Sequence, residues 1–395
     1  MRSSSRHPFL GSGRQCRESA ADLRHATHDV HVIRSPASTL TSTPFWQRPP
    51  ERYPGDLPDR ADVLVVGGGI TGMSLMHHMS QRGIEAVLVE RAHIAAGASG
   101  RNAGFLLAGV ADNYAAAVRT YGRHRTREVW QLTLENHDTM IAAASGQPVG
   151  YRRLGSATLA SGGEEAAQLA ESAQLLSEDG FEATWDGVRL VNPRDGEVDP
   201  AAMVGALARQ APRGAIREGV NVTGIEAGSS EVVVHANGAE CRAGCVILAT
   251  NAYTSQLLAQ VAIQPRRAQM LASAPEDTRL CDLPTYSHFG YRYWRQLQSG
   301  EVLVGGWRDT AYDVEVGYDE RPSAGIQLHL EAQLKRMGSG GGVTHRWAGT
   351  MGFTESGLPL VGPVDGMPNV YLCAGFNGHG MGFAFISARR LVDSL

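Results

Sequence analysis

The sequence predicts an α/β fold, α+β overall, with a second, discontinuous domain built largely on an antiparallel sheet. Residues 62–90 show a strand–helix–strand pattern, and residues 370–382 show a strand that enters a glycine-rich turn before a last helix. Between them, residues 265–307 alternate apolar and polar side chains, which is typical of antiparallel strands. Both ends of the chain are therefore expected to build one Rossmann-like nucleotide-binding domain, into which the middle is inserted.

The strand–helix–strand pattern begins with the apolar segment 62–66, which runs into three glycines. A helical pattern follows over residues 70–82, and Gly83 suits the end of that helix because glycine readily adopts the left-handed conformation found there. Residues 85–90 form a second apolar strand. This segment thus predicts one β-α-β unit with parallel strands and a right-handed crossover.

The remaining patterns divide the chain between the two domains. We expect further helices at residues 114–145, 164–180, 200–210 and 326–337, and further strands at residues 155–161, 220–226, 231–236, 245–250 and 302–307. The nucleotide-binding domain is predicted to comprise residues 61–150, 200–260 and 345–395, and the substrate domain residues 151–199 and 261–344. The proline-rich residues 45–60 predict a lead-in loop. Residues 1–44 have no sustained apolar period, which predicts a disordered extension.

Composition and charge argue against several classes of partner. The 395 residues carry a net charge of -4, which favours neither nucleic acid nor a membrane surface. No apolar run of about 18 residues occurs, so no membrane span is expected. The five cysteines are predicted to be reduced thiols in a cytoplasmic protein. The spacing of Cys241 and Cys245 is only weak evidence for a metal site, and we assign none.

Three glycines, Gly67, Gly69 and Gly72, match the G-x-G-x-x-G fingerprint of dinucleotide sites. Gly67 permits the tight turn after the strand, Gly69 lets a pyrophosphate approach the backbone, and Gly72 lets the helix lie close to the sheet. The helix N-terminus then presents unpaired N–H groups to the phosphates. Glu90 ends the second strand at the spacing expected of a ribose-binding carboxylate. This fingerprint predicts a dinucleotide site without distinguishing NAD from FAD.

Four segments of the chain, taken together, narrow the choice of cofactor. They are the glycine fingerprint at 67–72, the segment G-A-S-G-R-N-A-G-F at 97–105, V-I-L-A-T-N-A-Y at 246–253, and G-F-N-G-H-G-M-G at 375–382. Together they resemble the family of D-amino-acid oxidase, glycine oxidase and sarcosine oxidase, especially its gamma-glutamylputrescine oxidoreductase-like branch. The similarity extends from about residue 60 to the C-terminus, and it implies that the dinucleotide is FAD.

The resemblance also implies roles for the matching residues. The loop that contains Ser99 and Arg101 would lie beside the pyrophosphate and the isoalloxazine, and backbone atoms near Val222 would contact adenine. The turn at 378–381 would bring N–H groups to the N1/O2 edge of the flavin, where they stabilise the charge of its reduced form. The expected FAD-binding residues are Gly67, Gly69, Ile70, Thr71, Gly72, Glu90, Arg91, Ser99, Arg101, Asn102, Ala103, Val222, Ala249, Thr250, Gly375, Gly378, His379, Gly380 and Met381.

The chemistry that the resemblance implies is oxidation of a C–N bond. A hydride leaves the carbon next to an amine and passes to flavin N5, and the resulting imine hydrolyses. The substrate is expected to be an amine or an amino acid, and the electron acceptor is oxygen or another compound. His93 precedes the loop position at which some relatives link flavin to histidine, and residues 350–351 lack the cysteine that others use, so FAD is expected to be bound non-covalently.

Substrate binding is less clearly encoded. Amino-acid oxidases of this family grip the substrate carboxylate with an arginine shortly after a W-A-G sequence, and Met351 stands at that position here. A larger amine, or an amino acid held by another arginine, therefore fits better. We expect His379, Tyr293 and Arg346 to contact the reacting molecule. Further candidates are Tyr291, Arg295 and Trp307 for the wall of the pocket, and His288 for a base.

Three alternatives remain open at this stage. The chain lacks the lysine that promotes reaction with oxygen in sarcosine oxidase-like members, because Lys335 lies in a polar helix, so a dehydrogenase with another acceptor is possible. A non-catalytic FAD-binding subunit would explain the missing arginine at Met351. An NAD-dependent dehydrogenase would use the same glycine fingerprint but would not require residues 375–382.

Overall fold

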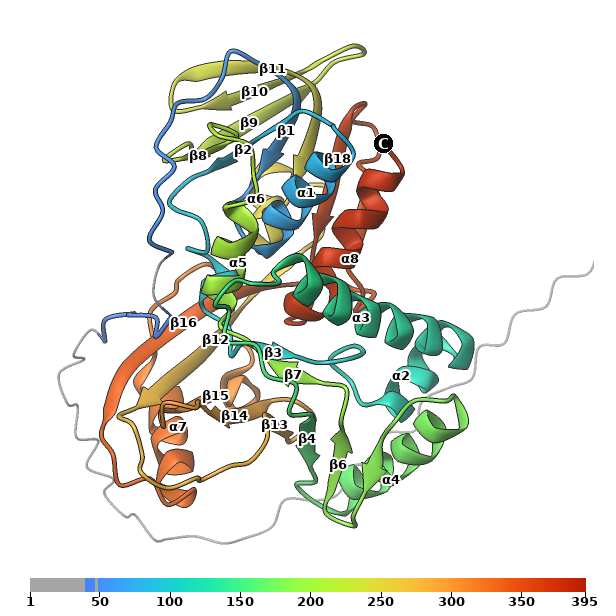
Figure 1. Cartoon of the computed structure of the whole chain (residues 1–395), viewed down its shortest axis with the longest axis vertical. Coiled ribbons are helices and arrows are strands. Elements are labelled where there is room, and N and C mark those ends of the chain that lie inside the picture. The colour runs from blue at the N-terminus through green and yellow to red at the C-terminus, as the bar shows by residue number, and fades with distance from the viewer. Residues whose placement is uncertain (1–39, 47–48) are drawn as a thin grey trace, which may run out of the picture. The chain divides into compact units, whose positions relative to one another are not determined.

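The first sheet brings together strands from both ends of the chain. In the computed structural model, which describes residues 40–46 and 49–395, β1 (Arg60–Val66) pairs in parallel with β2 (Ala86–Glu90) and with β11 (Ala239–Leu248). β8 (Ile216–Glu218) extends the sheet beyond β2, and β18 (Val370–Ala374) extends it beyond β11, both in parallel (Figure 1). An antiparallel strand, β17 (Leu360–Pro363), closes that edge.

The two faces of β1 contact different layers, because successive side chains of a strand point to opposite sides. Val63 and Val65 belong to the core formed with α1 (Ile70–Gln81), α5 (Pro200–Ala208) and α8 (Gly380–Asp393). Leu64 and Val66 face the core shared with β9 (Val222–Ala227) and β10 (Val232–Ala236), which continue from β11 as an antiparallel meander. The helix and both strands of the predicted β-α-β unit are therefore present.

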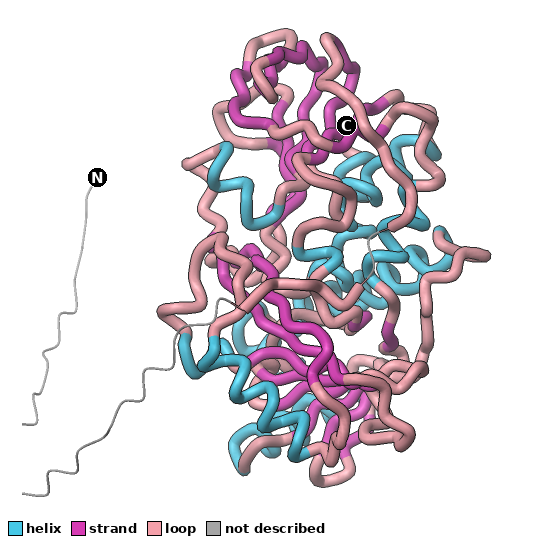
Figure 2. The backbone as a smooth tube through the Cα atoms, turned by 90° about the vertical axis from the view of Figure 1, so that its left-hand side faces the viewer, coloured by secondary structure: helices cyan, strands magenta, loops and turns pink. Residues whose placement is uncertain are grey.

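The second sheet is mostly antiparallel and contains the middle of the chain. Its order in the described residues is β16-β12-β15-β14-β13-β4-β6-β5. These strands are β16 (Val343–Phe353), β12 (Gln264–Ser273), β15 (Val302–Gly306), β14 (Arg292–Gln296), β13 (Thr285–Ser287), β4 (Ser156–Leu159), β6 (Arg189–Asn192) and β5 (Thr184–Trp185). Helix α7 (Ala324–Arg336) covers one face, where it packs on Leu271, Val304 and Trp307 (Figures 1 and 2). This arrangement is the α/β fold, α+β overall, that the sequence predicts.

The remaining elements connect the two sheets or cover their edges. α2 (Tyr114–Tyr121) and α3 (Arg123–Ala143) replace the single helix expected at residues 114–145, because Gly122 has φ +80° and ends the first helix. α3 packs on α8, and α2 packs on α4 (Gly163–Glu178). The short elements are β3 (Phe105–Leu106), β7 (Gly196–Glu197) and α6 (Thr254–Leu257).

Two boundaries differ from the expected domains. β16 belongs to the second sheet, although residues 345–395 were assigned to the nucleotide-binding domain. It pairs along the length of β12, an interaction between distant segments that local sequence does not reveal. Residues 42–44 do not form an extension, because Thr43 N donates to Arg346 O at 2.9 Å. Residues 1–39, on which the rest of that expectation falls, lie outside the described residues.

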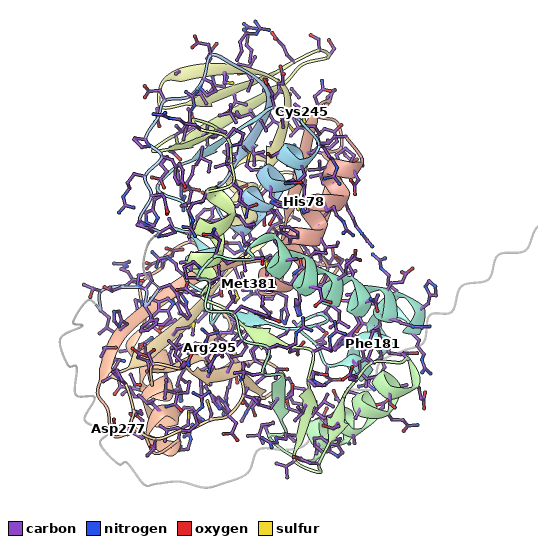
Figure 3. The ribbon with its side chains drawn as sticks, viewed as in Figure 1. His78, Phe181, Cys245, Asp277, Arg295 and Met381 are labelled. Carbon is purple, nitrogen blue, oxygen red and sulfur yellow. The ribbon has the colours of Figure 1, made fainter. Side chains whose placement is uncertain are left out.

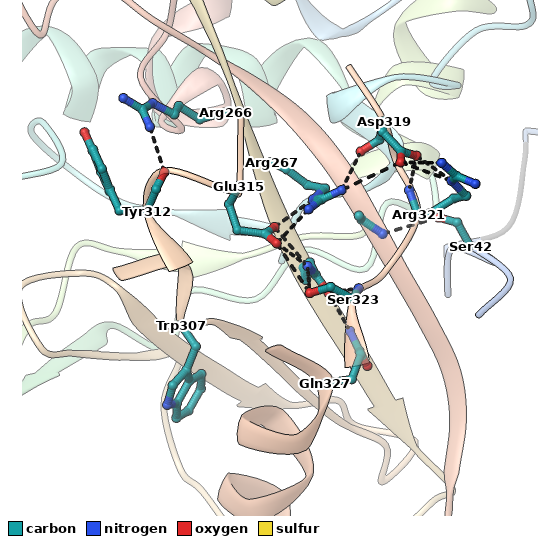
Figure 4. Close-up of polar contacts among 12 residues, drawn as sticks. Ser42, Arg266, Arg267, Trp307, Tyr312, Glu315, Asp319, Arg321, Ser323 and Gln327 are labelled. Carbon is teal, nitrogen blue, oxygen red and sulfur yellow. Dashed lines mark hydrogen bonds and ion pairs between the residues drawn. The ribbon is translucent and has the colours of Figure 1, made fainter. Parts of the chain in front are cut away.

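A buried ionic cluster fixes the segment between β15 and α7 against β12 (Figure 4). Arg267 on β12 donates to both oxygens of Glu315, each at 2.8 Å, and Glu315 is only 1% exposed. Gln269 donates to the same carboxylate at 2.8 Å and to Ser323 Oγ at 2.8 Å. The carboxylate is thus paired and hydrogen-bonded, as a buried charge requires.

Two other kinds of feature are absent from residues 40–46 and 49–395. No helix there has the length and apolar character needed to cross a membrane. No group of three or more His, Cys, Asp or Glu side chains in that part of the chain could hold a metal ion.

Candidate cofactor and substrate site

A cavity of about 780 Å³ lies at the carboxyl ends of β1, β2 and β11 and extends to the second sheet. Its wall includes the turn after β1, the end of β2, Val222 of β9, and the turn before α8. Figure 3 shows Met381, at the start of α8, between the two sheets. The carboxyl edge of a parallel sheet is where nucleotides bind in such folds, and this volume suits a large ligand.

The glycine turn at residues 67–72 packs closely against neighbouring atoms, which leaves little room for side chains. A Cβ atom at Gly67, where φ is +114°, would lie 2.7 Å from Ala249 O, and one at Gly69 would lie 2.8 Å from Ser99 Oγ. A Cβ atom at Gly72 would lie 1.9 Å from Gly67 O. Backbone contacts therefore require glycine at positions 67 and 72, whereas a side chain at position 69 would displace Ser99 Oγ from Ile70 N.

Two helices begin at this cavity, and Ser99 Oγ accepts from Ile70 N, the first N–H group of α1, at 2.9 Å. Neither Gly69, before α1, nor His379, before α8, caps its helix through a side chain. First-turn N–H groups and the positive end of each helix dipole therefore favour anionic groups. Glu90 Oε2 accepts from Gly68 N at 2.7 Å, which holds its carboxylate beside the turn. These donors and this carboxylate are the groups that a dinucleotide requires.

Most of the predicted cofactor residues lie on the wall of this one cavity. Gly72 and Gly375 do not: Gly72 packs α1 on the sheet, and Gly375, with φ +75°, supports the turn before α8. The predicted residues that line the cavity are Gly67, Gly69, Ile70, Thr71, Glu90, Arg91, Ser99, Arg101, Asn102, Ala103, Val222, Ala249, Thr250, Gly378, His379, Gly380 and Met381.

The opposite end of the cavity is aromatic and contains neutral polar groups. The rings of Tyr286 and Tyr293 meet edge to face with centres 5.6 Å apart, and the ring of His379 stacks on Tyr286 at 6.4 Å. Desolvation lowers the pKa of His379 to about 4, the hydrogen bond with Asn377 O opposes this, and Arg308 adds a smaller lowering. Desolvation raises the pKa of Tyr293 to about 12. These three side chains are therefore uncharged near neutral pH.

Arg346 is not part of this wall, so we do not retain it as a substrate contact. Its guanidinium pairs with Glu331 of α7 at 2.9 Å and donates to Gln327 at 3.0 Å. The alternation of β16 explains the difference, because Gly349 and Met351 line the cavity while Arg346 points toward α7.

Other residues that the sequence suggested for the pocket also lie elsewhere. Tyr291 and His288 do not line the cavity, and Trp307 is buried beneath α7. Arg295 is 2% exposed and donates to the carbonyls of Gly104 and Val198 at 2.8 and 3.1 Å. Desolvation lowers its pKa to about 10, although nearby carboxylates oppose this. Arg295 therefore supports the fold rather than the cavity wall.

Among the residues of the aromatic end that sequence reasoning missed are Tyr286, Arg308 and Phe353. Arg308 directly follows Trp307, which the sequence suggests for the pocket wall as an aromatic residue of the antiparallel region. The alternation of β15 stops at Gly306 and Trp307, where φ is +111° and +63°. The two left-handed residues turn Trp307 toward α7 and leave Arg308 on the cavity. A G-G-W-R segment at a strand end is the signal that could have suggested such a turn.

Comparison with known proteins agrees with this geometry. Residues 62–394 match the model of the family described as FAD dependent oxidoreductase (DAO). A probable oxidoreductase OrdL of Rhizobium meliloti is 26% identical, over 82% of this chain and 80% of that protein. Gamma-glutamylputrescine oxidoreductase of Escherichia coli is 24% identical, over 85% of this chain and 83% of that protein.

A solved structure shows the same fold. The glycine oxidase of Geobacillus kaustophilus superposes with a TM-score of 0.72 at 21% identity, covering 86% of this chain and 95% of that one. The glycine cradle, the two helix N-termini and the Glu90 carboxylate fit the dinucleotide that this family binds. The chain belongs to the family of FAD-dependent oxidoreductases, and its cofactor is FAD.

Proposed function

We propose that this protein oxidises the C–N bond of an amine or an amino acid, yielding an imine that hydrolyses in water. The observation that carries the proposal is the single cavity, which joins the glycine turn at one end to the pocket of Tyr286, Tyr293, Phe353 and His379 at the other. A substrate held among these aromatic rings would lie in the same cavity as the cofactor, beside it. Aromatic faces also suit an amine.

FAD would be held non-covalently by the cavity residues that the sequence identified. We propose as its ligands Gly67, Gly69, Ile70, Thr71, Glu90, Arg91, Ser99, Arg101, Asn102, Ala103, Val222, Ala249, Thr250, Gly378, His379, Gly380 and Met381. Gly72 and Gly375 would act through the backbone turns that they permit. When bound, FAD supplies the acceptor for the hydride that leaves the substrate.

The protein's own contribution would be orientation and control of protonation. His379 Nδ1 lies 3.4 Å from Asn377 O, so a hydrogen on Nδ1 would leave the lone pair of Nε2 free to accept a hydrogen bond from the neutral substrate amine. Tyr293 and Tyr286 would hold the carbon skeleton in place. The uncapped start of α8 would offer N–H groups to negative charge.

The relatives support this choice of substrate class. The names of several describe oxidoreductases of amines or amino acids, among them gamma-glutamylputrescine oxidoreductase and glycine oxidase. Their identities to this chain are 24% and 25%, so the specific substrate does not carry over.

Anaerobic reduction of the bound flavin tests the proposal. The purified protein is expected to release a yellow chromophore on denaturation. A panel of amines and amino acids, added without oxygen, is expected to bleach the bound flavin for at least one compound class. Admission of oxygen, or of a quinone, then shows which acceptor restores the colour. A flavin that no compound in a broad panel bleaches would argue instead for a non-catalytic FAD-binding subunit.

The pH dependence of flavin reduction should follow the pKa of the substrate ammonium group rather than that of His379. With a pKa of about 4, His379 is neutral above about pH 5, and Tyr293 stays protonated to about pH 11. The rate of flavin reduction should therefore rise with pH as the substrate ammonium group loses its proton. Stopped-flow reduction with two substrates of different amine pKa is expected to give two curves displaced by that difference.

One nearby carboxyl group provides the control for this experiment. Desolvation raises the pKa of the buried Asp195 to about 7, although hydrogen bonds from Ser156 and Ala108 oppose this. Asp195 lines a neighbouring cavity of about 90 Å³ that shares Tyr286 and His379 with the large one. A transition near pH 7 that is the same for both substrates and vanishes in Asp195→Asn would assign the dependence to Asp195, contrary to the prediction.

A further inference from the structure

Arg308 is a cationic side chain fixed at the aromatic end of the cavity. Its backbone is held by the preceding turn, in which Trp307 N donates to Tyr291 O at 2.9 Å and Trp307 O accepts from Thr310 Oγ1 at 2.8 Å. Trp307 itself is 2% exposed and packs under α7. The side chain of Arg308 therefore extends from an anchored position rather than from a free loop.

No described residue forms a hydrogen bond or ion pair with the guanidinium of Arg308. Its Nε is buried without a partner, and its Cζ lies 4.5 Å from the ring centre of Tyr291 and 5.3 Å from that of Phe353. The next residue, Asp309, faces Arg292 instead, at 3.7 Å. Rings on this guanidinium fix its position but leave its hydrogen-bond donors unused.

The other arginines of the cavity wall differ from Arg308. Among the described residues, Arg101 pairs with Glu320 at 3.2 Å and also donates to Ala348 O at 3.0 Å. Arg91 stacks on Tyr253 at 4.0 Å, next to Glu90 at the nucleotide end. Arg308 is the arginine that remains at the substrate end. Its neighbours Tyr286, Tyr293 and His379 are neutral. Desolvation raises the pKa of both tyrosines and lowers that of His379, and Arg308 makes a smaller contribution that lowers each of the three.

An unpaired guanidinium in a partly desolvated pocket is costly unless a ligand brings the missing anion. Its planar fork matches the two oxygens of a carboxylate. We propose that Arg308 binds a carboxylate of the substrate, so that the substrate is an amine that also carries a carboxylate. This inference rests on the proposed oxidation of an amine. The arginine comes from the turn after β15, whereas Met351 of β16 occupies the position where the sequence comparison expected one.

Binding of a carboxylate can be measured without turnover. Benzoate, added to the FAD-loaded protein, is expected to perturb the flavin absorption bands, and the uncharged benzamide is not. Arg308→Gln should weaken benzoate binding by about 10- to 100-fold, since a hydrogen bond to a charged group is lost. Arg308→Lys keeps the charge but not the planar fork, so its affinity for benzoate should lie between those of the wild type and Arg308→Gln.

A matched variant controls for the loss of an arginine. Arg266 also stacks on a tyrosine, Tyr312, at 4.1 Å, and belongs to the second sheet, but it does not line the cavity (Figure 4). Arg266→Gln should leave benzoate affinity unchanged. Unchanged benzoate affinity in Arg308→Gln would overturn the proposal. Loss of FAD from Arg308→Gln, with FAD retained by Arg266→Gln, would also overturn it, because Arg308 would then serve the cofactor.

A second measurement separates this inference from the proposed function. Amines are compared in pairs that differ only by the carboxylate, such as an amino acid and its decarboxylated amine. Arg308→Gln should raise KM for the carboxylated member by about 10-fold or more and leave the other unchanged. Amines that reduce the flavin equally well with and without the carboxylate would refute the role of Arg308 but not the function. Benzoate binding through Arg308 with no amine oxidised would refute the function but not the carboxylate site.

Discussion

Gly72→Ala is expected to weaken FAD binding by about 10- to 100-fold, although Gly72 does not line the cavity. A Cβ atom there would lie 1.9 Å from Gly67 O and 2.9 Å from Leu88 Cδ1. The first turn of α1 would have to move away from β1 and β2, and overpacking of this kind costs about 1–3 kcal/mol. The N–H groups at the start of α1 would move with it, away from the place proposed for the FAD phosphates. Fluorescence titration of the apoprotein with FAD measures the change.

The control for this variant is another glycine in the first turn of a helix. Gly325 is the second residue of α7, and a Cβ atom there would meet no other atom within 4 Å. Gly325→Ala should leave FAD affinity unchanged, and it should slightly stabilise the fold because alanine favours a helix. Equal FAD affinity in Gly72→Ala and the wild type would show that α1 tolerates the displacement and would contradict the role given to this glycine.

Arg267→Met should lower the free energy of unfolding by about 3–5 kcal/mol, because it leaves the buried carboxylate of Glu315 without its cation. Gln269 would remain as a partner of that carboxylate, but a neutral amide does not balance the charge. Chemical denaturation followed by circular dichroism measures the loss. The segment between β15 and α7 carries Arg308, so benzoate binding should weaken as well.

Two further variants show whether the unpaired charge is the cause. Arg321 pairs with Asp319 at 2.8 Å, and its side chain is 70% exposed, so Arg321→Met should produce no measurable change. The double variant Arg267→Met/Glu315→Leu should recover much of the stability, because apolar pairs often replace buried ion pairs without loss. A double variant less stable than Arg267→Met alone would mean that packing, and not the isolated charge, governs this cluster.

Local patterns identified the nucleotide half of the protein well. β1, α1 and β2 each appear within two residues of their expected bounds, because their apolar period and terminal glycines are properties of short segments. The helix α8 and the turn before it were expected for the same reason. Bends and long-range pairings were not predicted by local patterns. Gly122 divides one expected helix in two, and the long strand β16 was not expected.

The candidate substrate pocket depends on features that no local pattern contains. Arg346 and Tyr293 were both reasonable choices, but alternation along β16 directs Arg346 toward α7 while Tyr293 faces the cavity. Arg308 was missed because two left-handed residues interrupt the alternation of β15. Which side of a sheet faces a ligand depends on which helix covers the other side, and this is settled only when the chain packs.

The sequence by itself determined the dinucleotide turn, its Glu90 carboxylate and the resemblance to FAD-dependent oxidoreductases, because each depends on residues a few positions apart. The tertiary structure decided which arginine lies unpaired at the substrate end of the cavity. That outcome depends on Glu320, Glu331 and Asp309, which pair with Arg101, Arg346 and Arg292 and leave Arg308 facing the cavity. Charge pairing is a property of distances in the folded chain, and only the packing of the elements sets those distances.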